Sequence, residues 1–376
     1  GPIHDPAKEI PFPHPEIIPD IRLGDHILLD DGSLELETTA IAPPTITCRV
    51  HVGGLLTSHK GVNLPGVALQ IPAMTDKDRE DALLALELKL DYVALSFVRR
   101  AKDIEELRDY MEEHAHVPKE RHVGENPNWI PAIVAKIEKP EAFDDLEAIV
   151  RAADAIMVAR GDLGVETAPE RVPLAQKEII HLCNALGKPV ITATQMLQSM
   201  IEAPRPTRAE ASDVANAIID GSDAVMLSGE TSVGRYPVEA VRMMAKIAET
   251  VERSDSFPYE QLMDGTCGEG PLPTADLISR AISRATVKIA GECDATAILT
   301  STESGRTART VARHRPRCPL IAATPFEETA RRMQLVWGVT SVLVPPFEDT
   351  DQMIQTMVQA VVKHGYAEVG RTIVLT

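Results

Sequence analysis

The chain has 376 residues, 38 basic against 56 acidic side chains, and a formal net charge of −18 at pH 7. Proteins that bind nucleic acid or anionic membranes by charge carry a surplus of Lys and Arg, so we expect neither partner here. Aromatic residues make up only 3% of the chain. No apolar run approaches the roughly 20 residues that a membrane-spanning helix needs. At about 150 residues per domain, the length predicts two or three globular domains.

The five cysteines are irregularly spaced and form no Cys-x-x-Cys pair. An odd number without regular spacing argues against a disulfide framework and against a zinc site. The chain also begins without the charged and then apolar pattern of a secretory signal. These features together predict a reducing, cytoplasmic location.

Residues 1–66 are rich in predicted strands. Apolar and polar residues alternate over 26–29 and 34–37, on either side of the turn sequence Asp-Asp-Gly-Ser, which indicates a β-hairpin. A second alternating run covers residues 46–52. The first part of the chain is therefore predicted to be a small β unit.

From Thr75 onward, strands and helices are predicted to alternate. Thr75 and Asp78 have the spacing of a capping box, and so do Thr207 and Glu210. Helical segments of about 10–15 residues between strands favour a parallel sheet, hence an α/β architecture. Residues 252–274 are polar and rich in turn formers, and we interpret them as a linker to a second α/β unit. The predicted strands are 92–98, 133–138, 155–159, 189–194, 224–228, 297–300, 320–324, 339–344 and 371–375.

Four neighbouring strands of the middle region each end in polar residues. Because the carboxyl ends of parallel strands meet at one edge of a sheet, we expect one shared active site there. The four clusters are Lys136-Ile137-Glu138, Arg160-Gly161-Asp162, Thr192-Ala193-Thr194-Gln195 and Ser228-Gly229-Glu230.

The residue types in these clusters suit a bound cation and an anionic substrate. Lys136 and Glu138 are two apart on a strand and so face the same side. Glu138 and Asp162 can offer oxygen ligands to one hard cation, for which Mg²⁺ fits best. Gly161 would let a substrate approach the backbone, although it can also be a turn glycine. A buried structural ion pair remains the alternative for any one residue, but the whole set favours a site.

Five sequence blocks resemble the pyruvate kinase family, and the resemblance runs from about residue 9 to the end. It implies a partial (β/α)₈ TIM barrel with five of eight strands, a small β-barrel lid domain and a C-terminal α/β sandwich domain. The implied domains are the lid at residues 1–66, the barrel at residues 67–255 and the C-terminal domain at residues 256–376. The blocks are KGVNLPG at 60–66, MVARGDLG at 157–164, ATQML at 193–197, PRPTRAE at 204–210 and MLSGET at 226–231.

The resemblance implies phosphoryl transfer from phosphoenolpyruvate to ADP, the last step of glycolysis. Lys136 would stabilise the phosphoryl group, which agrees with the need of such reactions for charge neutralisation. Lys60 would reach the nucleotide phosphates. The other implied roles are Mg²⁺ (or Mn²⁺) binding by Glu138 and Asp162, phosphoenolpyruvate binding by Gly161, Asp162 and Thr194, and ordering of the proton-donating water by Thr194 and Ser228. A Thr or Ser at a strand end can instead cap the next helix.

A hydroxyl-rich loop follows the first strand of the last unit. Hydroxyls and backbone N–H groups before a helix can bind an anion, and the family places a sugar-phosphate effector here. A plain helix-cap turn is the alternative, and Glu303 within the loop weakens the phosphate interpretation. The predicted effector residues are Thr300, Ser301, Thr302, Ser304, Gly305 and Thr307.

Some family features have no counterpart in the sequence. These are three barrel strands with the K⁺ ligands and a substrate-binding arginine, the first part of the β domain, and the end of a closing hairpin. The polar stretch 116–129 has no functional account. We expect a portion of a complete enzyme, by resemblance a homotetramer. The alternatives are a truncated paralogue that acts in binding or assembly, and a Mg²⁺-dependent pyruvate-enolate lyase or aldolase without the phosphoryl step.

Overall fold

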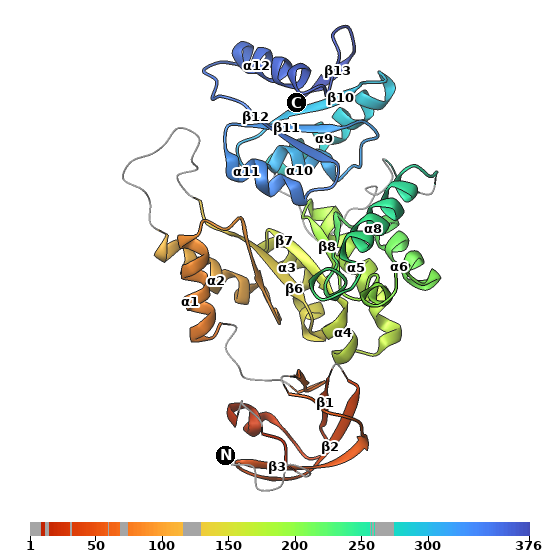
Figure 1. Cartoon of the computed structure of the whole chain (residues 1–376). Helices are drawn as coiled ribbons and strands as arrows, with labels where there is room; N and C mark the ends of the chain where they lie inside the picture. Colours follow the sequence, from red (N-terminus) through yellow and green to blue (C-terminus); the bar gives the residue numbers. More distant parts are fainter. Residues whose placement is uncertain are drawn as a thin grey trace.

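The computed structural model describes residues 9–11, 15–30, 32–58, 60–67, 74–115, 129–255, 257, 259 and 274–376. Three sheets lie in a row, and the units built on them are called here the N-terminal, central and C-terminal units (Figure 1). Residues 116–128 and most of the predicted linker lie outside the described residues. In the described part of the chain, no helix is both long and apolar enough to cross a bilayer.

The N-terminal unit is an antiparallel sheet with the strand order β3-β2-β1-β4. The predicted hairpin is confirmed, because β1 pairs with β2 and Leu29 lies opposite Leu34. These two side chains and Ile27 are buried on one face of the sheet, against Ile17 of the short helix η1. The elements are η1 (Pro15–Asp20), β1 (His26–Leu29), β2 (Leu34–Ala42), β3 (Thr45–Val52) and β4 (Val62–Asn63).

The central unit has five parallel strands in the order β5-β6-β7-β8-β9, which is also their order along the chain. Both predicted capping boxes are confirmed: Thr75 caps α1 and Thr207 caps α6. The strands are β5 (Tyr92–Leu95), β6 (Ala132–Ile137), β7 (Ala155–Ala159), β8 (Val190–Ala193) and β9 (Ala224–Val225). The helices are α1 (Asp76–Glu87), α2 (Ala101–His114), η2 (Pro140–Asp145), α3 (Leu146–Ala152), α4 (Arg160–Glu166), η3 (Pro169–Arg171), α5 (Val172–Leu186), η4 (Gln198–Ile201), α6 (Arg208–Ile219), α7 (Gly229–Ser232) and α8 (Pro237–Glu252).

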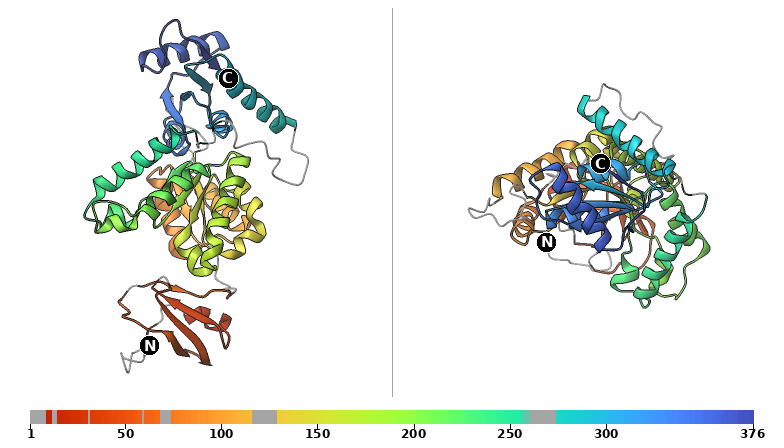
Figure 2. Two further views of the ribbon diagram at one scale, coloured as in Figure 1. Left: turned by 90° about the vertical axis from the view of Figure 1, so that its right-hand side faces the viewer. Right: turned by 90° about the horizontal axis from the view of Figure 1, so that it is seen from above.

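The pleat of β6 divides its side chains between two environments. Ile133, Ala135 and Ile137 belong to the core formed with the helices α2, α3 and α5. Lys136 lies on the opposite face because successive side chains of a strand alternate in direction. The helices lie around the outside of the strands (Figure 2), so Lys136 faces the inner side of the sheet.

Four strands of the central sheet end earlier than the sequence predicted, and β6 stops at Ile137, one residue before its predicted end. β5 ends at Leu95 because Phe97 has a φ of 54°, and β8 ends at Ala193 because Thr194 has a φ of 70°. β9 ends at Val225, and the backbone N–H of Ser228 turns toward the side chain of Glu230. Each early end lies in a segment that carries or supports the predicted site.

The C-terminal unit has a parallel sheet with the order β12-β11-β10-β13. One face packs on α9 and α10, and the other packs on α12. This unit and the N-terminal unit lie on opposite sides of the central unit (Figures 1 and 2). Its elements are α9 (Thr274–Glu292), β10 (Ala297–Ser301), α10 (Arg306–Ala312), β11 (Leu320–Thr324), α11 (Glu327–Arg332), η5 (Met333–Leu335), β12 (Val339–Leu343), α12 (Thr350–Lys363) and β13 (Ile373–Leu375).

A buried arginine joins the C-terminal and central units. Arg315 donates hydrogen bonds to the carbonyl of Gly221 (2.5 Å) and to Oδ1 of Asn184 (3.1 Å). Its guanidinium lies 3.4 Å from Oδ1 of Asp223 and 4.8 Å from the ring centre of Trp337. Burial raises the pKa of Asp223, and the charge of Arg315 opposes that effect. Since β9 follows Asp223 directly, the start of this strand is fixed to the C-terminal unit.

Candidate active site

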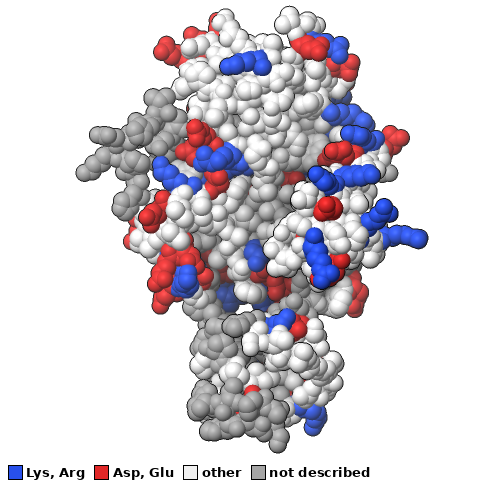
Figure 3. Space-filling view, in the orientation of Figure 1, with Lys and Arg blue, Asp and Glu red and all other residues white. Residues whose placement is uncertain are grey.

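The carboxyl ends of the central strands face the N-terminal unit. Helix α4, which follows β7 directly, lies at the junction of the two units (Figure 1). Acidic and basic side chains gather where these units meet on the face seen in Figure 3. The site predicted from the sequence therefore lies between the central sheet and the N-terminal unit.

Lys136 and Glu138 form a close pair at the end of β6. The ammonium of Lys136 lies 2.6 Å from Oε1 of Glu138 and donates a 3.0 Å hydrogen bond to Oγ of Ser96. The side chain of Glu138 is 1% exposed, and its Oε2 accepts a 2.7 Å hydrogen bond from the backbone N–H of Phe97. Ser96 and Phe97 follow β5, and no sequence pattern marked either residue.

The residues present fit a divalent cation. Oε1 of Glu138 is buried and accepts no hydrogen bond of good geometry, although Lys136 is close to it. Such an oxygen is suited to bind a cation. Asp162 is half-buried in the first turn of α4, the helix that follows the neighbouring strand β7. No cluster of three or more metal-ligating side chains exists among the described residues. Mg²⁺ does not require one, because it usually takes one or two carboxylates and completes its shell with water and substrate.

Gly161 and Thr194 lie against each other at the ends of β7 and β8. The backbone N–H of Gly161 donates a 2.8 Å hydrogen bond to Oγ1 of Thr194. Thr194 and Gln195 both have positive φ values, 70° and 55°. Two consecutive non-glycine residues in this conformation are strained, and such strain is typical of functional sites.

Arg160 supports this strained segment. Its guanidinium donates hydrogen bonds to the carbonyl of Thr194 and to Oδ1 of Asp213, both at 2.7 Å. A weaker bond at 3.3 Å reaches the carbonyl of Ala193. Arg160 belongs to a strand-end cluster in the sequence without a predicted role, and in the structure it holds the loop after β8.

Ser228 precedes the short helix α7, and a buried glutamate fixes its loop. Oε2 of Glu230 accepts a 2.8 Å hydrogen bond from the backbone N–H of Ser228, and Oε1 accepts a 3.0 Å bond from that of Leu197. Glu230 is 0% exposed. It therefore joins the loops that follow β8 and β9. In the sequence, Glu230 was marked only as a member of the cluster Ser228-Gly229-Glu230, and its contact with Leu197 was not predicted.

Lys60 lies in the N-terminal unit, across the junction from the strand-end residues. Its ammonium is 2.7 Å from Oδ1 of Asp30, in the turn after β1. The structure thus brings Lys136, Glu138 and the Gly161–Thr194 pair to neighbouring strand ends. Lys60 belongs to the N-terminal unit, which faces these strand ends.

The predicted effector loop combines buried and accessible residues. Thr300 is fully buried and donates a 3.3 Å hydrogen bond to the carbonyl of Ile321, and Thr302 is also buried. Gly305 is the N-cap residue before α10 and has a φ of 78°. Ser304 is exposed, and Thr307 lines a surface groove of about 310 Å³. The buried hydroxyls serve the fold, so an anion here would meet mainly the exposed side chains.

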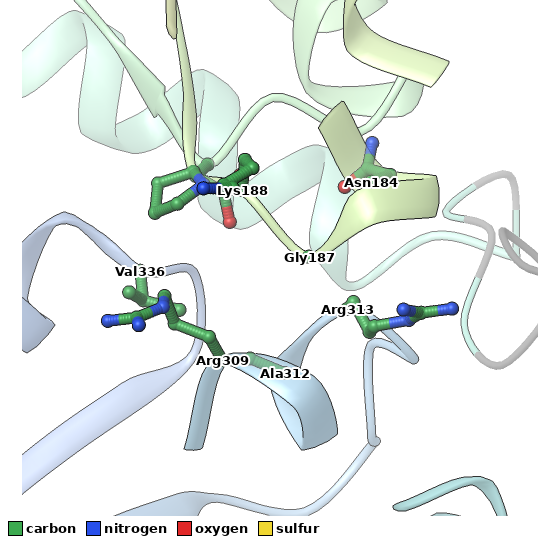
Figure 4. A pocket seen from close by; sticks show the side chains of 9 residues that line it. Asn184, Gly187, Lys188, Arg309, Ala312, Arg313 and Val336 are labelled. Atoms are coloured by element: carbon green, nitrogen blue, oxygen red, sulfur yellow. The ribbon is translucent and has the colours of Figure 1, made fainter. Parts of the chain in front are cut away.

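A second cavity, between the central and C-terminal units, has a volume of only about 10 Å³. Figure 4 shows that the side chain of Arg309, on α10, and that of Arg313, which directly follows α10, extend in opposite directions. The ammonium of Lys188 is held by the carbonyls of Arg151 and Ala153. A space of this size has room for about one water molecule, which is too small for a substrate.

Two family models match the chain, "Pyruvate kinase, barrel domain" over residues 5–241 and "Pyruvate kinase, alpha/beta domain" over residues 280–376. The pyruvate kinase of Clostridium acetobutylicum is 44% identical over 98% of this chain and 74% of its own length. That of Geobacillus stearothermophilus is 44% identical over 98% of this chain and 60% of its own length. Pyruvate kinase 2 of Synechocystis is 46% identical over 95% and 57%, respectively.

A solved structure is similar over nearly the whole chain. The crystal structure of a pyruvate kinase from Cryptosporidium parvum superposes with a TM-score of 0.85 and 35% sequence identity, over 96% of this chain and 72% of the other. The chain thus spans between 57% and 74% of the length of these relatives.

Proposed function

This chain belongs to the pyruvate kinase family, and on that premise we propose that it provides the catalytic centre for phosphoryl transfer from phosphoenolpyruvate to ADP, giving pyruvate and ATP. The observation that supports this most directly is the pairing of Lys136 with the buried carboxylate of Glu138 at the end of β6. The ammonium of Lys136 lies beside a carboxylate oxygen, Oε1 of Glu138, that accepts no hydrogen bond of good geometry. This arrangement suits a transferring phosphoryl group, which needs positive charge close to its oxygens.

Lys136 would act from the end of β6 in this scheme. Glu138 and Ser96 hold its ammonium at the strand end, where it can donate hydrogen bonds to the phosphoryl oxygens during transfer. A positive charge that is already in place where negative charge develops lowers the activation free energy of the transfer reaction. Glu138 and Asp162 are the residues that would hold Mg²⁺ or Mn²⁺. Bound there, such a cation would supply positive charge that offsets the negative charge of the phosphoryl group and of the enolate.

Gly161, Asp162 and Thr194 would bind phosphoenolpyruvate. The backbone N–H of Gly161 and the hydroxyl of Thr194 already form a hydrogen-bonded pair, so they present a defined polar surface at two neighbouring strand ends. After transfer, the enolate carbon needs a proton. The hydroxyls of Thr194 and Ser228 would order the water that supplies it.

In the same proposal, Lys60 binds the nucleotide phosphates, and the loop from Thr300 to Thr307 binds a sugar-phosphate effector. Thermal unfolding with a panel of phosphorylated sugars tests the effector site, and no stabilisation by any of them would contradict it. We also propose a cytoplasmic location and the division into three domains at residues 66 and 255. The family implies K⁺ dependence, but its K⁺ ligands have no counterpart in this sequence.

A homotetramer is the proposed assembly. Helix α9 carries exposed apolar side chains that a second copy could cover, and light scattering tests the mass. These side chains are Leu277, Ile278, Ile282 and Ile289.

A coupled assay with lactate dehydrogenase tests the reaction, because it records pyruvate release from phosphoenolpyruvate. We expect release that requires ADP and a divalent cation. Release of pyruvate from a keto-acid aldol without ADP would instead indicate a lyase or aldolase. Binding of phosphoenolpyruvate without turnover under any of these conditions would indicate a paralogue that has lost catalysis.

A further inference from the structure

A buried carboxylate bridges the N-terminal unit and the active-site helix. Glu166 is the last residue of α4, and its side chain is 2% exposed. Its Oε1 lies 2.6 Å from the ammonium of Lys139 and accepts a 3.0 Å hydrogen bond from Nδ2 of Asn63. Asn63 belongs to β4 of the N-terminal unit and is 103 residues away along the chain.

The two ends of this bridge lie next to residues of the proposed reaction. Helix α4 begins with Arg160-Gly161-Asp162, and Lys139 follows Glu138 directly. On the other side, Asn63 lies three residues after Lys60, and β4 pairs with β1. The contact between Asn63 and Glu166 therefore fixes the segment that carries Lys60 relative to the strand ends.

We propose that Glu166 is a positioning residue that docks the N-terminal unit on the barrel and thereby sets the position of Lys60 for the nucleotide phosphates. The role of Lys60 in this statement rests on the proposed function. The docking of the two units rests on the contacts alone.

Two further contacts connect the bridge to its surroundings. The ammonium of Lys139 lies 5.8 Å from the ring centre of Phe97, whose backbone N–H binds Glu138. On the side of the N-terminal unit, a Cβ atom on Gly32 would lie 3.9 Å from Val165, so the β1–β2 turn lies close to the end of α4. The bridge thus connects the carboxylate of Glu138 to the unit that carries Lys60.

Asn63 is the side chain through which the bridge can be tested with least damage to the fold. Removing its amide leaves Glu166 paired with Lys139, so no buried charge loses its counter-ion. Asn63→Ala removes one hydrogen bond to a charged group, and Asn63→Asp places a second carboxylate against Oε1 of Glu166. Asn216→Ala is a matched control, because Asn216 is exposed and its amide bonds only within α6.

The test measures ADP-dependent turnover of the protein. We expect Asn63→Ala to raise KM for ADP about tenfold and Asn63→Asp to raise it further, because a hydrogen bond to a charged group is worth about one order of magnitude in an equilibrium constant. KM for phosphoenolpyruvate and the exchange of pyruvate methyl protons with solvent should stay within about twofold of wild type, since the barrel residues alone perform those steps. Asn216→Ala should match wild type throughout.

Hydrogen exchange of the backbone amides of residues 60–67 separates this proposal from the proposed function. We expect faster exchange in Asn63→Asp than in wild type, whether or not the protein transfers phosphoryl groups. If the wild-type protein is inactive and Asn63→Asp still exchanges faster than wild type, the result would contradict the proposed reaction and support the docking role. Unchanged exchange together with an unchanged KM for ADP in both variants would overturn the role of Glu166.

Discussion

The backbone N–H of Gly161 donates a 2.8 Å hydrogen bond to the hydroxyl of Thr194, and this bond joins the ends of β7 and β8. Thr194 holds a φ of 70°, which is unfavourable for a β-branched residue. Arg160 fixes the carbonyl of the same residue. The segment is thus strained and supported from its neighbours, as expected where a hydroxyl must be held in one position.

The hydroxyl of Thr194 is predicted to matter for the reaction more than its methyl group. Thr194→Val should lower kcat by about two orders of magnitude, since it removes the hydroxyl and leaves the N–H of Gly161 without its acceptor. Thr194→Ser keeps the hydroxyl and should lose less than about tenfold. Steady-state kinetics of both variants would check this, and equal losses in the two would show that the hydroxyl has no special role.

Removing the charge of Lys136 is predicted to separate the two chemical steps. Lys136→Met should abolish phosphoryl transfer, because only this step needs the cation at the phosphoryl group, while exchange of pyruvate methyl protons should persist. The variant also leaves the buried Glu138 without its counter-ion. Mg²⁺ should therefore raise its melting temperature more than that of wild type. Transfer at the wild-type rate would remove Lys136 from the mechanism.

The elements of the fold were largely predictable because their signals are local. The capping boxes at Thr75 and Thr207 and the strand 155–159 follow from spacing and apolar runs alone, and the structure has each of them. The strand ends were placed less well. Phe97 and Thr194 adopt positive φ values that depend on hydrogen bonds to Glu138 and Gly161, and those partners come from other strands.

The pairing of Lys136 with Glu138 was predictable from the sequence, but the contacts that support the candidate site were not. Lys136 lies on β6 and Glu138 directly follows this strand, so their common side follows from the pleat continued by one residue. Glu166 could not be assigned in the same way, because its partner Asn63 is 103 residues away and in a different unit. Such contacts arise from the packing of units, which no local pattern encodes.

The buried Arg315 is predicted to be essential for joining the C-terminal unit. Arg315→Leu leaves Asp223 buried without its counter-ion, and loss of one partner from such a pair typically costs about 3–5 kcal/mol. Denaturant unfolding would check this. Arg317→Leu is the control, since Arg317 is exposed and lies over Tyr259. The double variant with Asp223→Asn should recover part of the loss, and no recovery would contradict the pairing argument.

His314 is predicted to make the protein less stable in mild acid. Burial, together with the nearby Arg313, Arg284 and Arg280, lowers the pKa of His314 from 6.5 to about 4. Between these values the unfolded chain binds a proton that the folded chain does not, so the free energy of unfolding falls as the pH falls. At pH 5 the loss amounts to about 2 kcal/mol relative to pH 7.5.

His314→Gln should reduce this pH dependence because glutamine stays neutral throughout. Urea unfolding at pH 7.5 and pH 5 of the variant and of wild type gives the comparison. An equal fall in stability for both proteins would show that other groups control the acid sensitivity.

³¹P NMR of phosphoenolpyruvate with ADP and Mg²⁺ would show whether Glu138, Asp162 and Lys136 form a centre for phosphoryl transfer, as proposed above. We predict that the phosphorus signal of phosphoenolpyruvate is replaced by that of the γ-phosphate of ATP. This conversion should require Mg²⁺ and should fall by at least about two orders of magnitude in Glu138→Gln. Formation of pyruvate with inorganic phosphate in place of ATP, or conversion at an equal rate in Glu138→Gln, would contradict the account.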